Sequence, residues 1–259
     1  MDEPLPLLIS IPHGGLEVPD CVKDRVALTE ADILEDADAF TREIYDFGER
    51  VHTVLRADIA RAIVDLNRDT TQLGADHPDG VIKSVTCYNK PVYRPGCFPD
   101  RDLIDKLIRD YHKPFHDKIR LALQNDEIAM GLDCHSMAAQ GPPTAKDRGR
   151  RRPMINIGNV MGRSCSMDHA NELAGCFRDI MDLSETDVKI NEPFSGGFIT
   201  RSYATAETPW IQIEISRAIY LRPPWFDQTT LAVSHQRLSE LNCLMWQVIQ
   251  RFWSRIAGC

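Results

Sequence analysis

Several short apolar runs in this chain end abruptly at a polar side chain. Residues 7–12 (LLISIP) end at His13, and residues 128–134 end at His135. Apolar runs of this length are typical of buried strands, whereas longer stretches between them repeat their apolar residues at helical spacing. Alternating strands and helices favour an α/β fold, a three-layer sandwich in which helices flank a mixed, mainly parallel sheet.

The remaining elements follow from the same periodicities. We expect strands at 7–12, 51–55, 62–66, 128–134, 154–157, 188–190 and 210–215. We expect helices at 28–50, 103–123, 169–181 and 231–256. Residues 69–100 are rich in Gly and Pro and predict a long irregular loop, which in a compact domain usually has a function such as covering a site. No internal repeat or linker is evident, so we expect one domain over residues 1–259.

The composition excludes several classes of protein. Of the 259 residues, 43% are hydrophobic, which is too high a fraction for a disordered chain. The formal net charge of −8 argues against a nucleic-acid partner held through phosphates and against adsorption to an anionic membrane. The eight cysteines are scattered without a C-x-x-C pair, and no signal peptide is evident, so we expect a reduced, cytoplasmic protein. The sequence leaves the oligomeric state open.

Polar residues that directly follow the apolar runs are candidates for a functional site, because open α/β sheets bind ligands beyond the carboxyl ends of their strands. His13 and His135 lie at two such ends. Two imidazoles can share one Zn²⁺, and a catalytic zinc needs a third protein ligand and an open position. A carboxylate would complete the set, and Glu17 and Asp38 are both candidates. Alternatively, each histidine is a loop residue whose ring is hydrogen-bonded to its surroundings.

Two further strand ends carry groups suited to substrate binding and proton transfer. Asn67 and Arg68 place an amide beside a planar fork of N–H donors, which can bind a substrate carboxylate bidentately. Alternatively, Arg68 forms a surface salt bridge with Asp65 or Asp69. Glu214 lies on the polar side of an alternating stretch and can act as a general base, or it can be an exposed residue paired with Arg217.

Taken together, a set of ordered segments resembles the N-formylglutamate amidohydrolase family. The segments run in the family's order from near residue 8 to near residue 221 and cover most of the chain. They are 10–15 (SIPHGG), 38–40 (DAF) with 44–47 (IYDF), 61–68 (RAIVDLNR), 133–137 (DCHSM), 158–159 (GN) with 162–165 (GRSC), 196–203 (GGFITRSY), and 212–217 (QIEISR) with Tyr220. Each segment alone is a weak signal, but the ordered set is specific.

The resemblance implies a fold similar to that of the zinc carboxypeptidases and aspartoacylases. It also implies that His13 and His135 are zinc ligands. The third ligand that we prefer is Asp38, which lies in a matching segment, with Glu17 or Asp36 as the other choices. The residues that would bind the substrate are Asn67, Arg68, Ser136 and Arg201.

The reaction that the resemblance implies is hydrolysis of the amide bond of an N-formyl or N-acyl amino acid, a small-molecule substrate. Glu214 would be the general base that takes the proton of a zinc-activated water. One alternative is a zinc carboxypeptidase-like peptidase acting on short peptides, which would need an open cleft instead of a closed pocket. Another is a non-catalytic binding protein on the same fold, which predicts an incomplete set of metal ligands.

Overall fold

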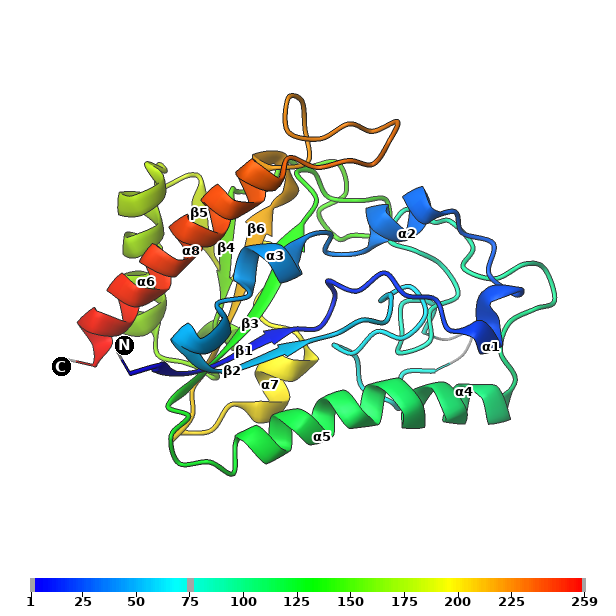
Figure 1. Ribbon diagram of the computed structural model, residues 1–259, viewed down its shortest axis with the longest axis horizontal. Coiled ribbons are helices and arrows are strands. Elements are labelled where there is room, and N and C mark those ends of the chain that lie inside the picture. Colours follow the sequence, from blue (N-terminus) through cyan, green and yellow to red (C-terminus); the bar gives the residue numbers. More distant parts are fainter. Residues whose placement is uncertain (1–2, 74–76, 258–259) are drawn as a thin grey trace.

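One mixed sheet forms the centre of the structure, a computed structural model that describes residues 3–73 and 77–257 (Figure 1). Its strands are β1 (Leu5–Ile11), β2 (Val51–Arg56), β3 (Met130–Met137), β4 (Ile155–Gly158), β5 (Val188–Ile190) and β6 (Trp210–Ser216). They are ordered β2-β1-β3-β6-β4-β5. The first four strands in this order are parallel, β4 is antiparallel to β6, and β5 is parallel to β4. The expected mixed, mainly parallel sheet is confirmed.

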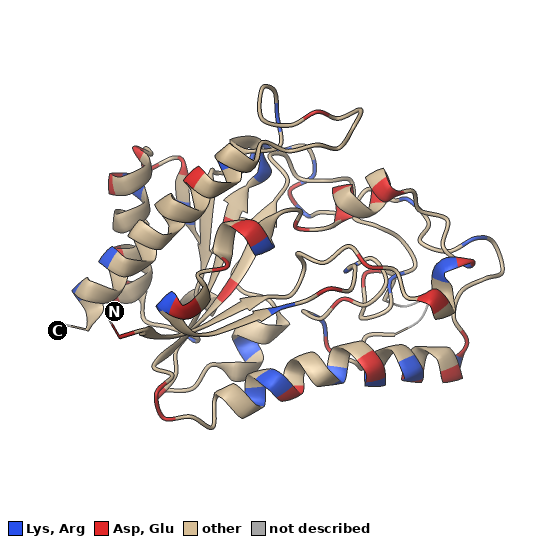
Figure 2. Ribbon diagram, in the orientation of Figure 1, with Lys and Arg blue, Asp and Glu red and all other residues tan. Residues whose placement is uncertain are grey.

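Helices cover both faces of this sheet and complete a three-layer sandwich, as expected. They are α1 (Asp20–Lys23), α2 (Glu30–Asp36), α3 (Thr41–Tyr45), α4 (Arg101–Leu107), α5 (Lys113–Ala122), α6 (Met167–Met181), α7 (Phe198–Tyr203) and α8 (His235–Ile256). Figure 1 shows α3, α6 and α8 on one face, and α4, α5 and α7 on the other. Charges of both signs are interspersed along α4 and α5 (Figure 2). In the described ranges, no helix combines the length and apolar character needed to cross a membrane.

The apolar side chains of the central strands divide between two cores. Leu7, Ile9 and Ile11 of β1 pack in the core beneath α6 and α8, whereas Leu8 packs in the core on the opposite face. Successive side chains of a strand point to opposite faces, so a strand covered on both sides is apolar throughout. This burial explains why β1 reads as a continuous apolar run instead of an alternating one.

The single helix expected over 28–50 is wrong. Helix α2, capped by Thr29, ends at Asp36. The backbone of Ala37 is extended, and Phe40 has a positive φ of 64°. The helical pattern continues in α3 and in a 3₁₀ turn, Gly48–Arg50. At the break, the backbone N–H of Asp38 donates to the carbonyl oxygen of His13 at 3.0 Å. Tertiary contacts therefore override the local periodicity and turn Asp38 towards the end of β1.

The strand expected over 62–66 is also wrong. The segment is buried, but it forms a turn in which the N–H groups of Ile63 and Val64 both donate to the carbonyl oxygen of Ala60. A short apolar run specifies burial more strongly than it specifies strand geometry, and no strand in the described part of the chain pairs with this run. The described part of 69–100 contains no helix or strand, as expected.

Other element boundaries shift by a few residues. The last helix starts at His235 instead of residue 231, because Ser234 caps it by accepting the N–H of Arg237. The helix expected over 103–123 is α4 and α5 joined by a π-helical turn, Ile108–His112. The short helix α7 was not expected, since its sequence follows a pair of glycines that suggested a loop.

Candidate metal centre and active site

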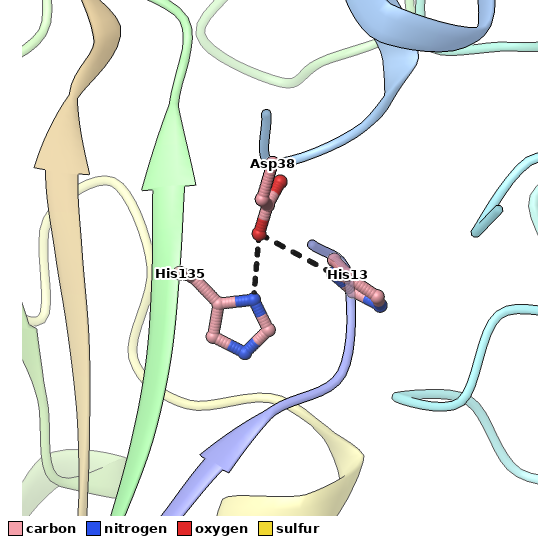
Figure 3. A group of neighbouring side chains, drawn as sticks. All are labelled: His13, Asp38 and His135. Carbon is pink, nitrogen blue, oxygen red and sulfur yellow. Dashed lines mark hydrogen bonds and ion pairs between the residues drawn. The ribbon is translucent and has the colours of Figure 1, made fainter. Parts of the chain in front are cut away.

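Three buried side chains from separate segments meet beyond the ends of β1 and β3. His13 follows β1 by two residues, His135 lies near the end of β3, and Asp38 comes from the break between α2 and α3. One carboxylate oxygen of Asp38, Oδ2, lies 2.8 Å from Nδ1 of His135 and 3.5 Å from Nδ1 of His13 (Figure 3). None of the three residues is more than 3% exposed. Both imidazoles therefore present the same ring nitrogen to a single point.

A second carboxylate holds the far side of each imidazole ring. Nε2 of His13 lies 2.7 Å from Asp65, and Nε2 of His135 lies 3.2 Å from Asp133. An imidazole that donates from one nitrogen to a carboxylate keeps its other nitrogen free to bind a metal. Nδ1 of His13 is buried and has no hydrogen-bond partner within the described residues. Two imidazole nitrogens and a carboxylate oxygen fit a divalent cation such as Zn²⁺.

The charges around this group favour a cation at its centre. Burial by itself raises the pKa of Asp38, but contacts with His13, His135 and Arg61 outweigh burial and hold that pKa well below its usual range. Burial by itself lowers the pKa of His135, but Asp133 and Asp38 raise it well above its usual range. The carboxylate of Asp38 is thus held charged, and a proton or a metal ion between it and the two imidazoles is stabilised.

The other two carboxylates considered as a third ligand lie elsewhere. Glu17 is exposed, and Asp36 is buried in an ion pair of 3.4 Å with Lys83. Arg61 lies 3.4 Å from Asp38, on the side away from the histidines, which contact the other carboxylate oxygen. Of the candidate carboxylates, Asp38 is the one that the structure brings to both histidines.

Glu214 lies on β6 directly opposite His135 in the parallel pairing with β3. Its carboxylate accepts a hydrogen bond of 2.7 Å from Nε2 of Gln212, and the residue is only 6% exposed. Burial, reinforced by Asp38, raises the pKa of Glu214 to about 7. A carboxylate with this pKa can both accept and release a proton near neutral pH. The alternative of an exposed glutamate is wrong.

Asn67 is brought to the histidine site, but its amide is already engaged. Nδ2 donates to Asp133 at 3.2 Å and lies 3.1 Å from Nε2 of His135, while Oδ1 accepts the backbone N–H of Ile199 at 2.7 Å. Through these contacts Asn67 links the start of α7 to the carboxylate of Asp133. In this arrangement Asn67 supports the imidazole of His135 and has little free capacity for a substrate.

The remaining substrate-binding candidates are also placed by the structure. Arg68 forms an ion pair of 2.7 Å with Asp79 of the irregular loop, instead of with Asp65 or Asp69 as the salt-bridge alternative expected. Arg201 lies exposed on α7 and donates to the carbonyl oxygens of the two glycines that precede this helix. Ser136 follows His135 on β3, so its side chain points to the opposite face of the sheet.

Several groups that organise the site were not singled out from the sequence. Asp133 precedes His135 by two residues on one strand, so strand alternation places both side chains on one face, a signal that was available. Asp65 lies in the segment misread as a strand, and Arg61 directly precedes it. Lys83 comes from the irregular loop, and no local pattern indicates that its side chain is fully buried among carboxylates.

Comparisons with known proteins find similar chains over nearly the whole length. A family model described as N-formylglutamate amidohydrolase matches residues 5–221. An N-formylglutamate deformylase of Pseudomonas putida is 29% identical over 226 residues, which cover 84% of this chain and 82% of that protein. The crystal structure of N-formylglutamate amidohydrolase from Ralstonia eutropha JMP134 has a TM-score of 0.80 at 19% identity, covering 100% of this chain and 96% of that one.

A second solved structure, a gene product of Agrobacterium tumefaciens, has a TM-score of 0.63 at 18% identity and covers 97% of this chain and 91% of that one. At these identities the two structures show the fold alone. The family model spans far more than half of the chain and matches the family that the ordered segments resembled. This chain belongs to the N-formylglutamate amidohydrolase family.

Proposed function

We propose that this chain is a zinc-dependent hydrolase that cleaves the amide bond of an N-formyl amino acid, with N-formylglutamate as the first substrate to test. The observation that carries the proposal is the buried group of His13, Asp38 and His135, with Glu214 on the next strand. The name of the Pseudomonas putida relative, N-formylglutamate deformylase, supports the choice of substrate.

In this proposal the protein's own groups supply orientation and proton transfer. Nδ1 of His13, Nδ1 of His135 and a carboxylate oxygen of Asp38 would hold the metal, and Asp65 and Asp133 keep the two rings oriented. A bound Zn²⁺ would supply a Lewis acid that polarises the acyl carbonyl and acidifies water. The carboxylate of Glu214 takes a proton from the attacking water and passes it to the nitrogen of the leaving amine.

The burial of the site favours a small substrate over a long peptide. His13, Asp38, His135 and Glu214 are each at most 6% exposed. Lys83, from the long irregular loop, is fully buried against Asp65, Asp36 and Asp79, so that loop packs close to the centre. The peptidase alternative needs an open cleft, and the non-catalytic alternative needs an incomplete ligand set; the observed burial and ligand set speak against both.

The proposal is tested by release of formate from a panel of N-formyl amino acids, with N-acetyl amino acids and short peptides alongside. We expect one bound metal ion per chain, formate release that stops after chelation and returns with Zn²⁺, and loss of turnover in Glu214→Gln. The exposed Glu207→Gln is the matched control and should keep full turnover. Absence of bound metal, or full turnover in Glu214→Gln, would overturn the proposal, and cleavage of peptides alone would establish the peptidase.

A further inference from the structure

Arg217 is a guanidinium beside the site that lacks a carboxylate partner in the described ranges 3–73 and 77–257. It follows β6 directly, three residues after Glu214. Within those ranges its side chain makes one hydrogen bond, from Nη1 to the backbone carbonyl oxygen of Glu35 at 2.6 Å. Nε is buried and has no acceptor there. A buried, charged donor without a partner is costly unless another molecule supplies the acceptor.

The neighbouring arginines are compensated, which sets Arg217 apart. Arg61 pairs with two aspartates of the site, at 3.4 and 3.2 Å. Arg68 pairs with Asp79, and Arg152 holds Asp147 through two hydrogen bonds of 2.7 and 2.8 Å. Each of these guanidinium groups already has an anion inside the protein.

Arg217 also lies within electrostatic reach of the proposed metal ligands. Burial lowers its pKa, but Asp38 is the strongest of the neighbouring groups that raise it, and the net pKa is raised. The bond to Glu35 ties Arg217 to α2, three residues before Asp38. A second bond, from the Tyr220 hydroxyl to the carbonyl oxygen of Ala39 at 2.8 Å, ties the other side of the same segment. The guanidinium is therefore held in place before any ligand arrives.

We infer that Arg217 binds a carboxylate of the N-acyl amino acid substrate, an inference that rests on the proposed function. The edge of the guanidinium that carries Nε and Nη2 has two parallel N–H donors, and among the residues that the structure describes this edge makes no hydrogen bond. Two such donors match the two oxygens of a carboxylate. This assignment replaces Arg68 and Arg201 as the substrate clamp, because their donors are used by Asp79 and by backbone carbonyls.

The experiment compares wild type, Arg217→Gln and Arg217→Lys on three substrates: N-formyl-L-glutamate, its α-amide and its γ-amide. Arg178→Gln, which removes a half-buried arginine from α6 on the opposite face of the sheet, is the matched control. Bound metal is measured in every variant. Binding of glutarate to each variant, followed by calorimetry, supplies a readout that does not depend on turnover.

We expect Arg217→Gln to lower kcat/KM for N-formyl-L-glutamate by roughly tenfold to a hundredfold. The amide that lacks the carboxylate bound by Arg217 should be a poor substrate for wild type. On that amide, Arg217→Gln should change kcat/KM by less than about threefold. Glutarate binding should weaken in parallel, with metal content unchanged. Arg217→Lys should recover part of the loss, because it restores the charge without the fork.

Equal losses on all three substrates, or loss of bound metal in Arg217→Gln, would show that Arg217 only braces the segment around Asp38 and would overturn the inference. Full retention of kcat/KM and glutarate affinity would overturn it as well. These outcomes are distinct from failure of the proposed function, in which metal-loaded wild type releases formate from none of the substrates.

Discussion

Replacement of Glu214 by Gln separates its proposed role in proton transfer from its role in the fold. Gln has nearly the same shape and can keep the 2.7 Å contact with Gln212, but it cannot accept a proton from water. We expect kcat to fall by about 10²- to 10⁴-fold, the usual contribution of general acid–base catalysis, with little change in KM. Steady-state kinetics on the metal-loaded protein measure both quantities.

The same substitution should stabilise the metal-free protein, and the size of the effect follows from the raised pKa. Burial raises the pKa of Glu214 from its ordinary 4.5 to about 7. Because the folded-state pKa is the higher one, the charged carboxylate costs stability as the pH rises from 4.5 to 7. At about 1.4 kcal/mol per pH unit, the cost reaches about 3 kcal/mol above pH 7. Glu214→Gln removes this cost.

Urea unfolding of chelator-treated protein between pH 4 and pH 8 measures this difference. The free energy of unfolding of Glu214→Gln should equal that of wild type near pH 4 and exceed it by about 3 kcal/mol at pH 8. The exposed Glu207→Gln should follow wild type at every pH. If the difference in free energy of unfolding between Glu214→Gln and wild type is no larger at pH 8 than at pH 4, the reasoning about burial is refuted. Retained kcat would refute the role as base.

Three further predictions follow from individual contacts. Asp133→Asn should weaken the affinity for Zn²⁺ by about 10- to 100-fold, because the carboxylate orients His135. Competition with a chromogenic chelator measures this affinity, and an unchanged value would show that the Asp133 carboxylate does not support metal binding. Because Asp133 and Asp38 raise the pKa of His135, its metal-free imidazole holds a proton more tightly than an ordinary histidine, so Zn²⁺ binding should release a proton and tighten with rising pH. Calorimetry in buffers of different ionisation enthalpy checks this, and zero protons released would contradict it. Gly131→Ala should lower the free energy of unfolding, measured in urea, by about 1–3 kcal/mol, because its Cβ would overlap the Trp210 ring. Gly175→Ala should not lower it. A Gly131→Ala variant as stable as wild type would contradict the packing of β3 against β6.

The strands that carry the site could be predicted from the sequence because they are buried on both faces. The runs that end at His13 and His135 are apolar over almost their full length, and such runs have few other places in an α/β fold. Once they are adjacent and parallel, the two histidines must lie at the same edge of the sheet. The alternating stretch around Glu214 placed that residue on the same face in the same way.

Features set by contacts between distant segments could not be predicted. The helical spacing over 28–50 gave no sign of the break at Ala37, which depends on contacts of the Asp38 segment with His13, just after β1, and with Tyr220. The partners of Arg68 and Arg217 depend on how the irregular loop and α2 fold back on the sheet. The salt bridge expected for Arg68 was therefore with Asp65 or Asp69, close in sequence, whereas the observed partner is Asp79, eleven residues away.

X-ray absorption spectroscopy of the zinc-loaded protein tests the proposed ligand set most directly. We predict a first shell of two imidazole nitrogens and at least one carboxylate oxygen at about 2.0–2.2 Å from the metal, with no sulfur. The signal of one imidazole should disappear in His13→Ala and in His135→Ala. A sulfur shell at about 2.3 Å, or a spectrum that neither substitution changes, would contradict a metal centre built from His13, Asp38 and His135.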